Sequence, residues 1–156
     1  MRKIFSVSLV IALCLLYPGT YGKGLSAAVC EPTSSDALGP FYKPNAPIRS
    51  SVGTGYVLRG VVRTAKDCSP VAGAMVELWL AGPNGEYDDA HRATIIADAL
   101  GAYRFESNVP QPYYGRPPHI HLRISAKGFK TLVTQHYPSD GRKNAVFDIV
   151  LVPAKH

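Results

Sequence analysis

The chain has 156 residues, of which 46% are hydrophobic and 18% charged, and its formal net charge is +6. About 128 residues remain once an N-terminal leader is set aside, which is enough for one domain with a hydrophobic core and too few for two. In that remainder 14 basic residues stand against 11 acidic ones, a net charge of +3, and they are scattered along the chain. The composition therefore gives no support to nucleic-acid binding.

The N-terminus has the pattern of a secretory signal peptide. Arg2 and Lys3 precede an apolar run over residues 4–16, which is too short to span a bilayer. Small residues before position 29 predict cleavage after Ala28, with an earlier site near Gly22 as the alternative. We therefore expect residues 1–28 to be a signal peptide, the protein to be secreted or periplasmic, and no other stretch to form a stable membrane span.

Export changes how the three cysteines are interpreted. Cys14 lies in the predicted signal peptide, so the mature chain keeps Cys30 and Cys68. Two cysteines in an oxidising compartment most simply form one disulfide, which would tie the start of the mature chain to the first hairpin. The alternative is a free or metal-bound pair.

Residues 29–55 are predicted to form an irregular arm. The segment is rich in Pro, Ser and Asn, and Pro40, Pro44 and Pro47 interrupt any regular ladder of hydrogen bonds. Phe41 and Tyr42 within it are expected to pack against the domain rather than to contact a substrate.

The remainder, residues 56–156, is predicted to form one all-β domain. Turn residues recur between short segments with strand composition, and no amphipathic helix of ordinary length is evident. The expected strands are 56–63, 74–80, 92–97, 102–107, 118–125, 130–136 and 146–153. This spacing indicates an antiparallel β-sandwich.

The strongest chemical signal is the pair His119 and His121. In an extended strand both imidazoles project from one face while Ile120 and Leu122 project from the other. Two neutral imidazoles side by side are ready ligands for iron, copper, nickel or zinc. The alternative is that one histidine satisfies a hydrogen bond and the other lies on the surface.

Nearby tyrosines favour the metal. Tyr87 lies in a Gly-Pro-Asn-Gly turn, and Tyr113 and Tyr114 lie just before the histidines. Two tyrosinates with two neutral histidines carry a charge of about −2, which favours a trivalent ion, and ferric iron is the common one. No Cys-x-x-Cys or His-Glu-x-x-His motif competes for the metal.

Five segments in order resemble the intradiol ring-cleavage dioxygenases, which include catechol and protocatechuate dioxygenases. The resemblance runs from about residue 38 to residue 152. Its segments are Gly39-Pro40-Phe41-Tyr42, Gly73 to Trp79 with Gly85-Glu86-Tyr87, Pro110-Gln111-Pro112-Tyr113, Arg116 to His121, and Thr134-Gln135. The resemblance implies a prealbumin-like sandwich topology.

The resemblance also implies a site and a reaction. The metal ligands would be Tyr87, Tyr113, His119 and His121, with Tyr114 as the fallback for Tyr113, and the cofactor would be Fe(III). The substrates would be a catechol and O₂. The ring would be cleaved between its two hydroxylated carbons to a muconate-type product.

Three residues would act on the substrate by this resemblance. Tyr113 would leave the iron and take up a proton, Arg116 would stabilise developing negative charge, and Gln135 would orient oxygen or the ring. A salt bridge and ordinary strand polarity are the alternative roles of Arg116 and Gln135. His91 and His136 are expected on the surface.

Two departures and two alternatives remain. Only five residues separate Tyr113 from His119, which implies an open site, and the helical region used for dimerisation by catechol dioxygenases is lacking. The oligomeric state is therefore open, with a homo-oligomer as one option. Residues 58–79 also resemble non-catalytic, prealbumin-like binding modules. A zinc hydrolase is a further alternative, although no carboxylate base adjoins the histidine pair.

Overall fold

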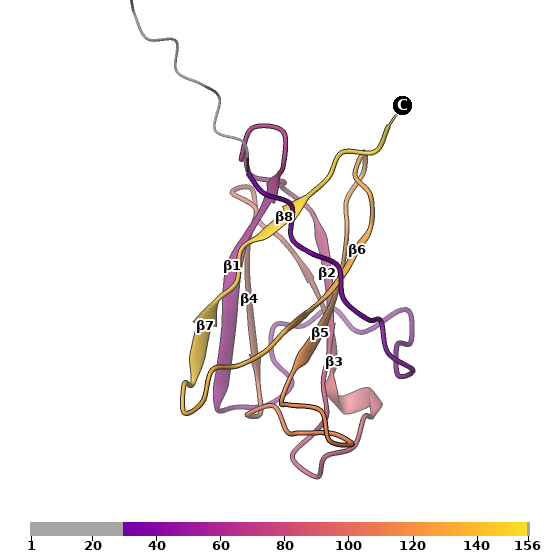
Figure 1. Ribbon diagram of the computed structural model, residues 1–156, viewed down its shortest axis with the longest axis vertical. Coiled ribbons are helices and arrows are strands. Elements are labelled where there is room, and N and C mark those ends of the chain that lie inside the picture. Colours follow the sequence, from indigo (N-terminus) through magenta and orange to yellow (C-terminus); the bar gives the residue numbers. More distant parts are fainter. Residues whose placement is uncertain (1–29, 156) are drawn as a thin grey trace, which may run out of the picture.

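The computed structural model describes residues 30–155, and the predicted signal peptide lies outside them. Two sheets pack face to face (Figure 1), so the predicted all-β sandwich is confirmed. One sheet has the order β4-β1-β7, with β8 also paired to β1, and the other has the order β3-β2-β5-β6. The elements are β1 (Tyr56–Thr64), β2 (Met75–Trp79), the 3-10 helix η1 (Asp89–His91), β3 (Arg92–Ile96), β4 (Ala102–Ser107), β5 (Ile120–Ser125), β6 (Leu132–His136), β7 (Asn144–Val146) and β8 (Ile149–Leu151).

The core lies between the two sheets and follows the alternation of the strands. Leu58 and Phe105 face inward from β1 and β4, and Leu78, Leu122 and Ile124 face them from β2 and β5. All five are fully buried. Because successive residues of a strand point to opposite faces, their neighbours on β2 and β5 point to the outside of the second sheet.

The last predicted strand, 146–153, differs in the structure. It is split into β7 and β8, and both run parallel to β1, so the first sheet is mixed rather than purely antiparallel. At the break, Oδ1 of Asp148 accepts a hydrogen bond from the Val61 N–H at 2.9 Å, in place of a backbone carbonyl. Gly60 permits the close approach, since a Cβ there would lie 2.1 Å from the Phe147 carbonyl oxygen.

The N-terminal arm is irregular, as predicted, and it covers the edges of three strands (Figure 1). The N–H of Asp36 donates to a carbonyl of β6 at 2.9 Å, that of Arg49 to β3 at 3.1 Å, and that of Val52 to β4 at 2.9 Å. Exposed strand edges are templates for pairing with other chains. The arm therefore protects the sandwich while crossing the outer face of the second sheet.

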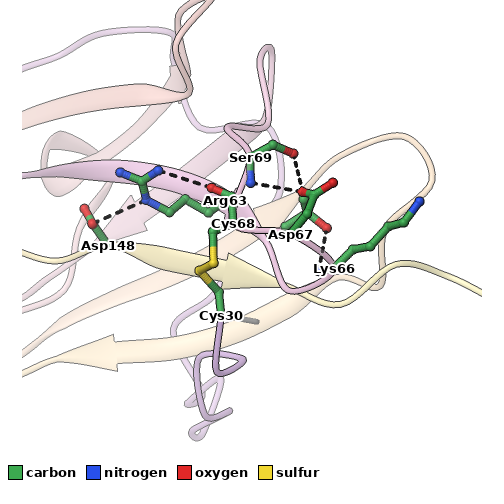
Figure 2. Close-up of a disulfide and its surroundings, with 8 residues drawn as sticks. Cys30, Arg63, Lys66, Asp67, Cys68, Ser69 and Asp148 are labelled. Atoms are coloured by element: carbon green, nitrogen blue, oxygen red, sulfur yellow. Dashed lines mark hydrogen bonds and ion pairs between the residues drawn. A yellow bond between two sulfur atoms is a disulfide. The ribbon is translucent and has the colours of Figure 1, made fainter. Parts of the chain in front are cut away.

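A disulfide between Cys30 and Cys68 fixes the start of the arm to the β1–β2 turn (Figure 2), which confirms the predicted pairing. The turn is held on both sides of the disulfide. Arg63 donates to the carbonyl of Cys68 at 3.2 Å, and Oδ1 of Asp67 accepts from the N–H and the hydroxyl of Ser69 at 3.1 and 2.6 Å. The disulfide thus links the arm covalently to the turn that joins the two sheets.

The expectation that His91 and His136 lie on the surface is wrong for His136. This side chain is buried, and its Nε2 lies 2.7 Å from the hydroxyl of Tyr56. Its strand neighbour Gln135 points outward, so alternation directs His136 inward, where the phenol satisfies the ring nitrogen. His91 is half-buried, with Nδ1 2.7 Å from Oδ1 of Asp88.

Among residues 30–155, no helix is long and apolar enough to cross a membrane.

Candidate metal centre

Strand register builds a row of side chains on the outer face of the second sheet. Trp79 of β2 is paired with His121 of β5, and His121 is paired with Gln135 of β6. The indole of Trp79 stacks on the imidazole of His121, with ring centroids 4.9 Å apart and planes 3° apart. The row places His121 beneath the arm, on the face opposite the core.

The two predicted histidine ligands meet at their ring nitrogens. Nε2 of His119 lies 3.1 Å from Nε2 of His121, and both side chains are buried. Nδ1 of His119 lies 2.8 Å from the carbonyl oxygen of Pro117. Because a carbonyl only accepts, Nδ1 carries the proton in the neutral ring, and the Nε2 lone pair points into the site.

Burial keeps both imidazoles in the form that binds metals. It lowers the pKa of His119, with the Arg116 cation adding to the effect. Burial also lowers the pKa of His121 to about 4, and neighbouring His119 contributes. Both rings are therefore neutral at pH 7, as a metal ligand must be.

Tyr87 reaches the histidines from the loop after β2. The loop is closed by hydrogen bonds from Gly82 N–H to the carbonyl of Glu86 at 2.8 Å and from Gly85 N–H to the carbonyl of Gly82 at 2.9 Å. This closure directs the phenol inward, and its oxygen lies 3.0 Å from Nε2 of His119. Burial raises the pKa of Tyr87 to about 12, so the phenol needs an adjacent cation to ionise at neutral pH.

A tight turn separates the positions of Tyr113 and Tyr114. Backbone hydrogen bonds join Tyr113 and Arg116 in both directions, and the central residues Tyr114 and Gly115 have φ of 45° and 75°, the type I′ arrangement. Tyr113 faces Tyr87, with ring centroids 5.3 Å apart, whereas Tyr114 at the tip of the turn is 90% exposed. The choice of Tyr113 over Tyr114 stays a prediction, and this geometry favours it.

Arg116 is held by hydrogen bonds rather than by a direct salt bridge. Its Nη2 donates to Oε1 of Gln135 and to the hydroxyl of Tyr137, each at 2.9 Å. The Tyr137 hydroxyl lies 2.9 Å from Oδ2 of Asp36 in the arm. Nε2 of Gln135 donates to the carbonyl of Ala37 at 2.6 Å, so both ends of its amide are engaged.

The donor set fits a ferric ion with phenolate ligands. Among the described residues no three His, Cys, Asp or Glu side chains form a group that could hold a metal, so the phenols are needed to complete a site here. Nε2 of His121 faces Nε2 of His119 at 3.1 Å, and two neutral ring nitrogens this close together are placed to bind one metal ion. Two neutral nitrogens beside phenol oxygens suit a hard trivalent cation.

The sequence interpretation missed residues that the arm contributes. Gly39 packs on His121, since a Cβ at Gly39 would lie 2.9 Å from Cε1 of that ring. Phe41 packs, as expected, but it packs on Tyr87 and Tyr113. Asp36 in the arm and Tyr137, which directly follows β6, were also missed because no local motif marks them.

Comparisons with known proteins agree with the motifs. The chain is 30% identical over 137 residues to a chlorocatechol 1,2-dioxygenase of Pseudomonas sp. (strain P51), covering 66% of this chain and 54% of that protein. The chain spans about half the length of the curated relatives that it matches first. No family model matches the chain.

Solved structures match over a larger share. The dioxygenase domain of a dioxygenase and carbohydrate-binding protein fusion from Streptomyces sp. SirexAA-E has a TM-score of 0.72 and 29% identity, covering 80% of this chain and all of that chain. An intradiol ring-cleavage dioxygenase from Tetranychus urticae has a TM-score of 0.73 at 18% identity, covering 81% and 97%, and it shares the fold. The chain is therefore similar in sequence and in fold to the intradiol ring-cleavage dioxygenases, as its motifs predicted.

Proposed function

We propose that this protein is a non-haem Fe(III) dioxygenase that cleaves catechols between their two hydroxylated carbons. The observation that carries the proposal is the approach of Tyr87 and His121 to Nε2 of His119, at 3.0 and 3.1 Å, in a relative of the intradiol dioxygenases. The contacting groups come from the loop after β2 and from β5 with its approach. Tyr113, 5.3 Å from Tyr87 between ring centroids, would be the fourth ligand.

The four side chains would hold the metal as two neutral imidazoles and two phenolates. When bound, ferric iron supplies a Lewis acid that accepts the diol oxygens and makes the ring reactive toward dioxygen. Tyr113 is only half-buried, so we assign it the acid–base role: its phenolate oxygen takes up a proton from the entering diol. Tyr87, which is packed in the closed loop, would remain a ligand.

Arg116 would stabilise negative charge on the substrate. A fixed guanidinium at the rim stabilises developing anionic character because it is already oriented before the reaction begins. Gln135 and Tyr137 provide that orientation through their hydrogen bonds. Since both ends of the Gln135 amide are engaged, its proposed role is to position Arg116 rather than to bind oxygen directly.

The remaining features of the proposal concern substrate and location. The short connection between Tyr113 and His119 favours an open site, and the products would be muconate-type acids. The protein is proposed to be secreted or periplasmic, which the Cys30–Cys68 disulfide supports because such bonds persist in oxidising compartments. The proposal includes assembly into a homo-oligomer, and gel filtration would test this oligomeric state.

The test combines metal loading with oxygen uptake. Protein loaded with ferric iron is expected to show a burgundy tyrosinate-to-iron absorption band, which shifts when catechol is added. Oxygen uptake should match catechol consumption one to one, with a muconate absorbing in the ultraviolet. Iron-loaded protein without this band and without oxygen uptake on a panel of catechols would refute the proposal and favour the non-catalytic binding module.

A further inference from the structure

Phe41 contacts both tyrosines of the proposed metal centre. Its ring stacks on Tyr87, with centroids 4.3 Å apart and planes 9° apart. The same ring meets Tyr113 at 5.1 Å and 89°, an edge-to-face contact. Tyr87 and Tyr113 also meet edge to face, at 5.3 Å and 87°. The three rings therefore form a closed triangle in which each contacts the other two.

Tyr113 depends on these ring contacts for its position. Within residues 30–155 its hydroxyl makes no hydrogen bond, and its other aromatic neighbour is Tyr114, at 4.8 Å. Tyr114 is 90% exposed and lies at the tip of the same turn, so it cannot fix Tyr113 against the rest of the domain. Phe41 and Tyr87 are then the ring partners from other parts of the chain.

Phe41 is itself held on its C-terminal side by its neighbours in the arm. The hydroxyl of Tyr42 donates to Oε1 of Glu77 at 3.2 Å. Lys43 forms an ion pair with Asp89 at 2.9 Å, and its carbonyl accepts from Nη1 of Arg92 at 2.8 Å. These contacts fasten the arm to β2 and to the segment that follows Tyr87.

The N-terminal side of Phe41 is fixed by close packing. Gly39 has φ of 74°, and a Cβ there would lie 2.9 Å from Cε1 of His121. The segment Gly39–Phe41 thus contacts three of the four proposed ligands: His121, Tyr87 and Tyr113. A rigid segment that contacts three ligands at once is able to set their mutual positions.

We propose that Phe41 is a positioning residue that fixes the two phenols of the metal centre relative to each other. The inference rests on the proposed function, because it concerns the same ligands, and it assigns to the arm a role beyond covering strand edges. Offset or edge-to-face aromatic pairs have specific geometry, which an aliphatic side chain of similar volume does not reproduce.

The test compares Phe41→Leu with Phe41→Tyr, which keeps the ring, and with Phe129→Leu, the same substitution at a partly buried core position. Each ferric protein is mixed with a chelator, and the rate of iron loss and the position of the charge-transfer band are measured. Phe41→Leu is expected to lose iron about tenfold faster, as the loss of two aromatic contacts implies, and to shift the band. Phe41→Tyr and Phe129→Leu should match the wild type.

A second readout uses metal-free protein and does not depend on iron. Nuclear magnetic resonance of labelled tyrosines should show faster ring flipping of Tyr87 and Tyr113 in Phe41→Leu, with no change in Phe129→Leu. Phe41→Met replaces Phe41→Leu if the latter does not fold, as judged by circular dichroism.

The outcomes separate the inference from the proposed function. Equal iron loss, band position and ring flipping in the Phe41 and Phe129 variants would overturn the role of Phe41. A burgundy ferric wild type in the same experiment would still support the proposed function. A wild type that binds no ferric iron would overturn the proposed function, and the role of Phe41 in a metal centre with it.

Discussion

The Cys30–Cys68 disulfide gives the sharpest prediction of stability. The substitution pair Cys30→Ser and Cys68→Ser removes a crosslink between residues 38 positions apart, which joins the arm to the β1–β2 turn. The crosslink restricts the unfolded chain, so its removal raises the entropy of the unfolded state while the hydrogen bonds of the arm remain.

The magnitude follows from the length of the closed loop. Loop-closure entropy for 38 residues corresponds to about 4 kcal/mol in the free energy of unfolding at 25 °C. For a domain of this size, whose unfolding entropy is about 0.26 kcal/mol/K, this predicts a decrease in Tm of about 15 °C.

Thermal unfolding followed by circular dichroism measures the decrease, with metal-free protein so that ligand binding does not contribute. Wild-type protein whose disulfide is kept reduced by a phosphine is the matched control, because it loses the crosslink without any substitution. The doubly substituted protein and the reduced wild type should unfold at similar temperatures. If both unfold within about 3 °C of the oxidised wild type, the entropic reasoning is refuted, since even a short loop should contribute more than that.

Three further predictions concern the site and its surroundings. Iron content measured after gel filtration should decrease in Tyr87→Phe and be lost in His121→Ala; wild-type iron content in both would remove the proposed site. Gly39→Ala places a Cβ 2.9 Å from the His121 ring at a φ of 74°. The free energy of unfolding should therefore decrease by more than about 1 kcal/mol, which is the strain expected from a left-handed backbone alone. Gly128→Ala, with a φ of 84° and no atom within 4 Å, is the control and should show that strain only. Burial lowers the pKa of His136 to about 4, so the unfolded state binds the proton first and stability should decrease as the pH falls from about 6.5 to about 4. In His136→Gln urea unfolding across this range should have a shallower dependence on pH, and an unchanged dependence would contradict the assignment.

The sequence by itself determined most of the strands and the shared face of the central histidine pair. Turn residues set the strand boundaries to within a few positions, and the period of two placed His119 and His121 on one face because alternation is a local property of extended backbone. The motifs also predicted the similarity to intradiol dioxygenases that the comparisons found. The disulfide followed from the presence of two cysteines in a chain predicted to be exported.

Tertiary structure decided how the last strand pairs and what surrounds the site. Both β7 and β8 pair parallel to β1, and between them the side chain of Asp148 replaces a backbone acceptor, which no local pattern reveals. The partner that satisfies the buried His136, the hydroxyl of Tyr56, lies 80 positions away in the sequence. Register between strands, rather than composition, aligned Trp79 with His121.

The same reason explains the arm. Its prolines predicted an irregular segment, but only the folded chain brings Gly39 and Phe41 onto proposed ligands that follow them by dozens of residues. Asp36 and Tyr137 meet across 101 positions to hold Arg116 in place. Contacts of this kind arise from packing between distant segments, so the sequence predicts the candidate site residues, whereas the fold decides which residues surround them.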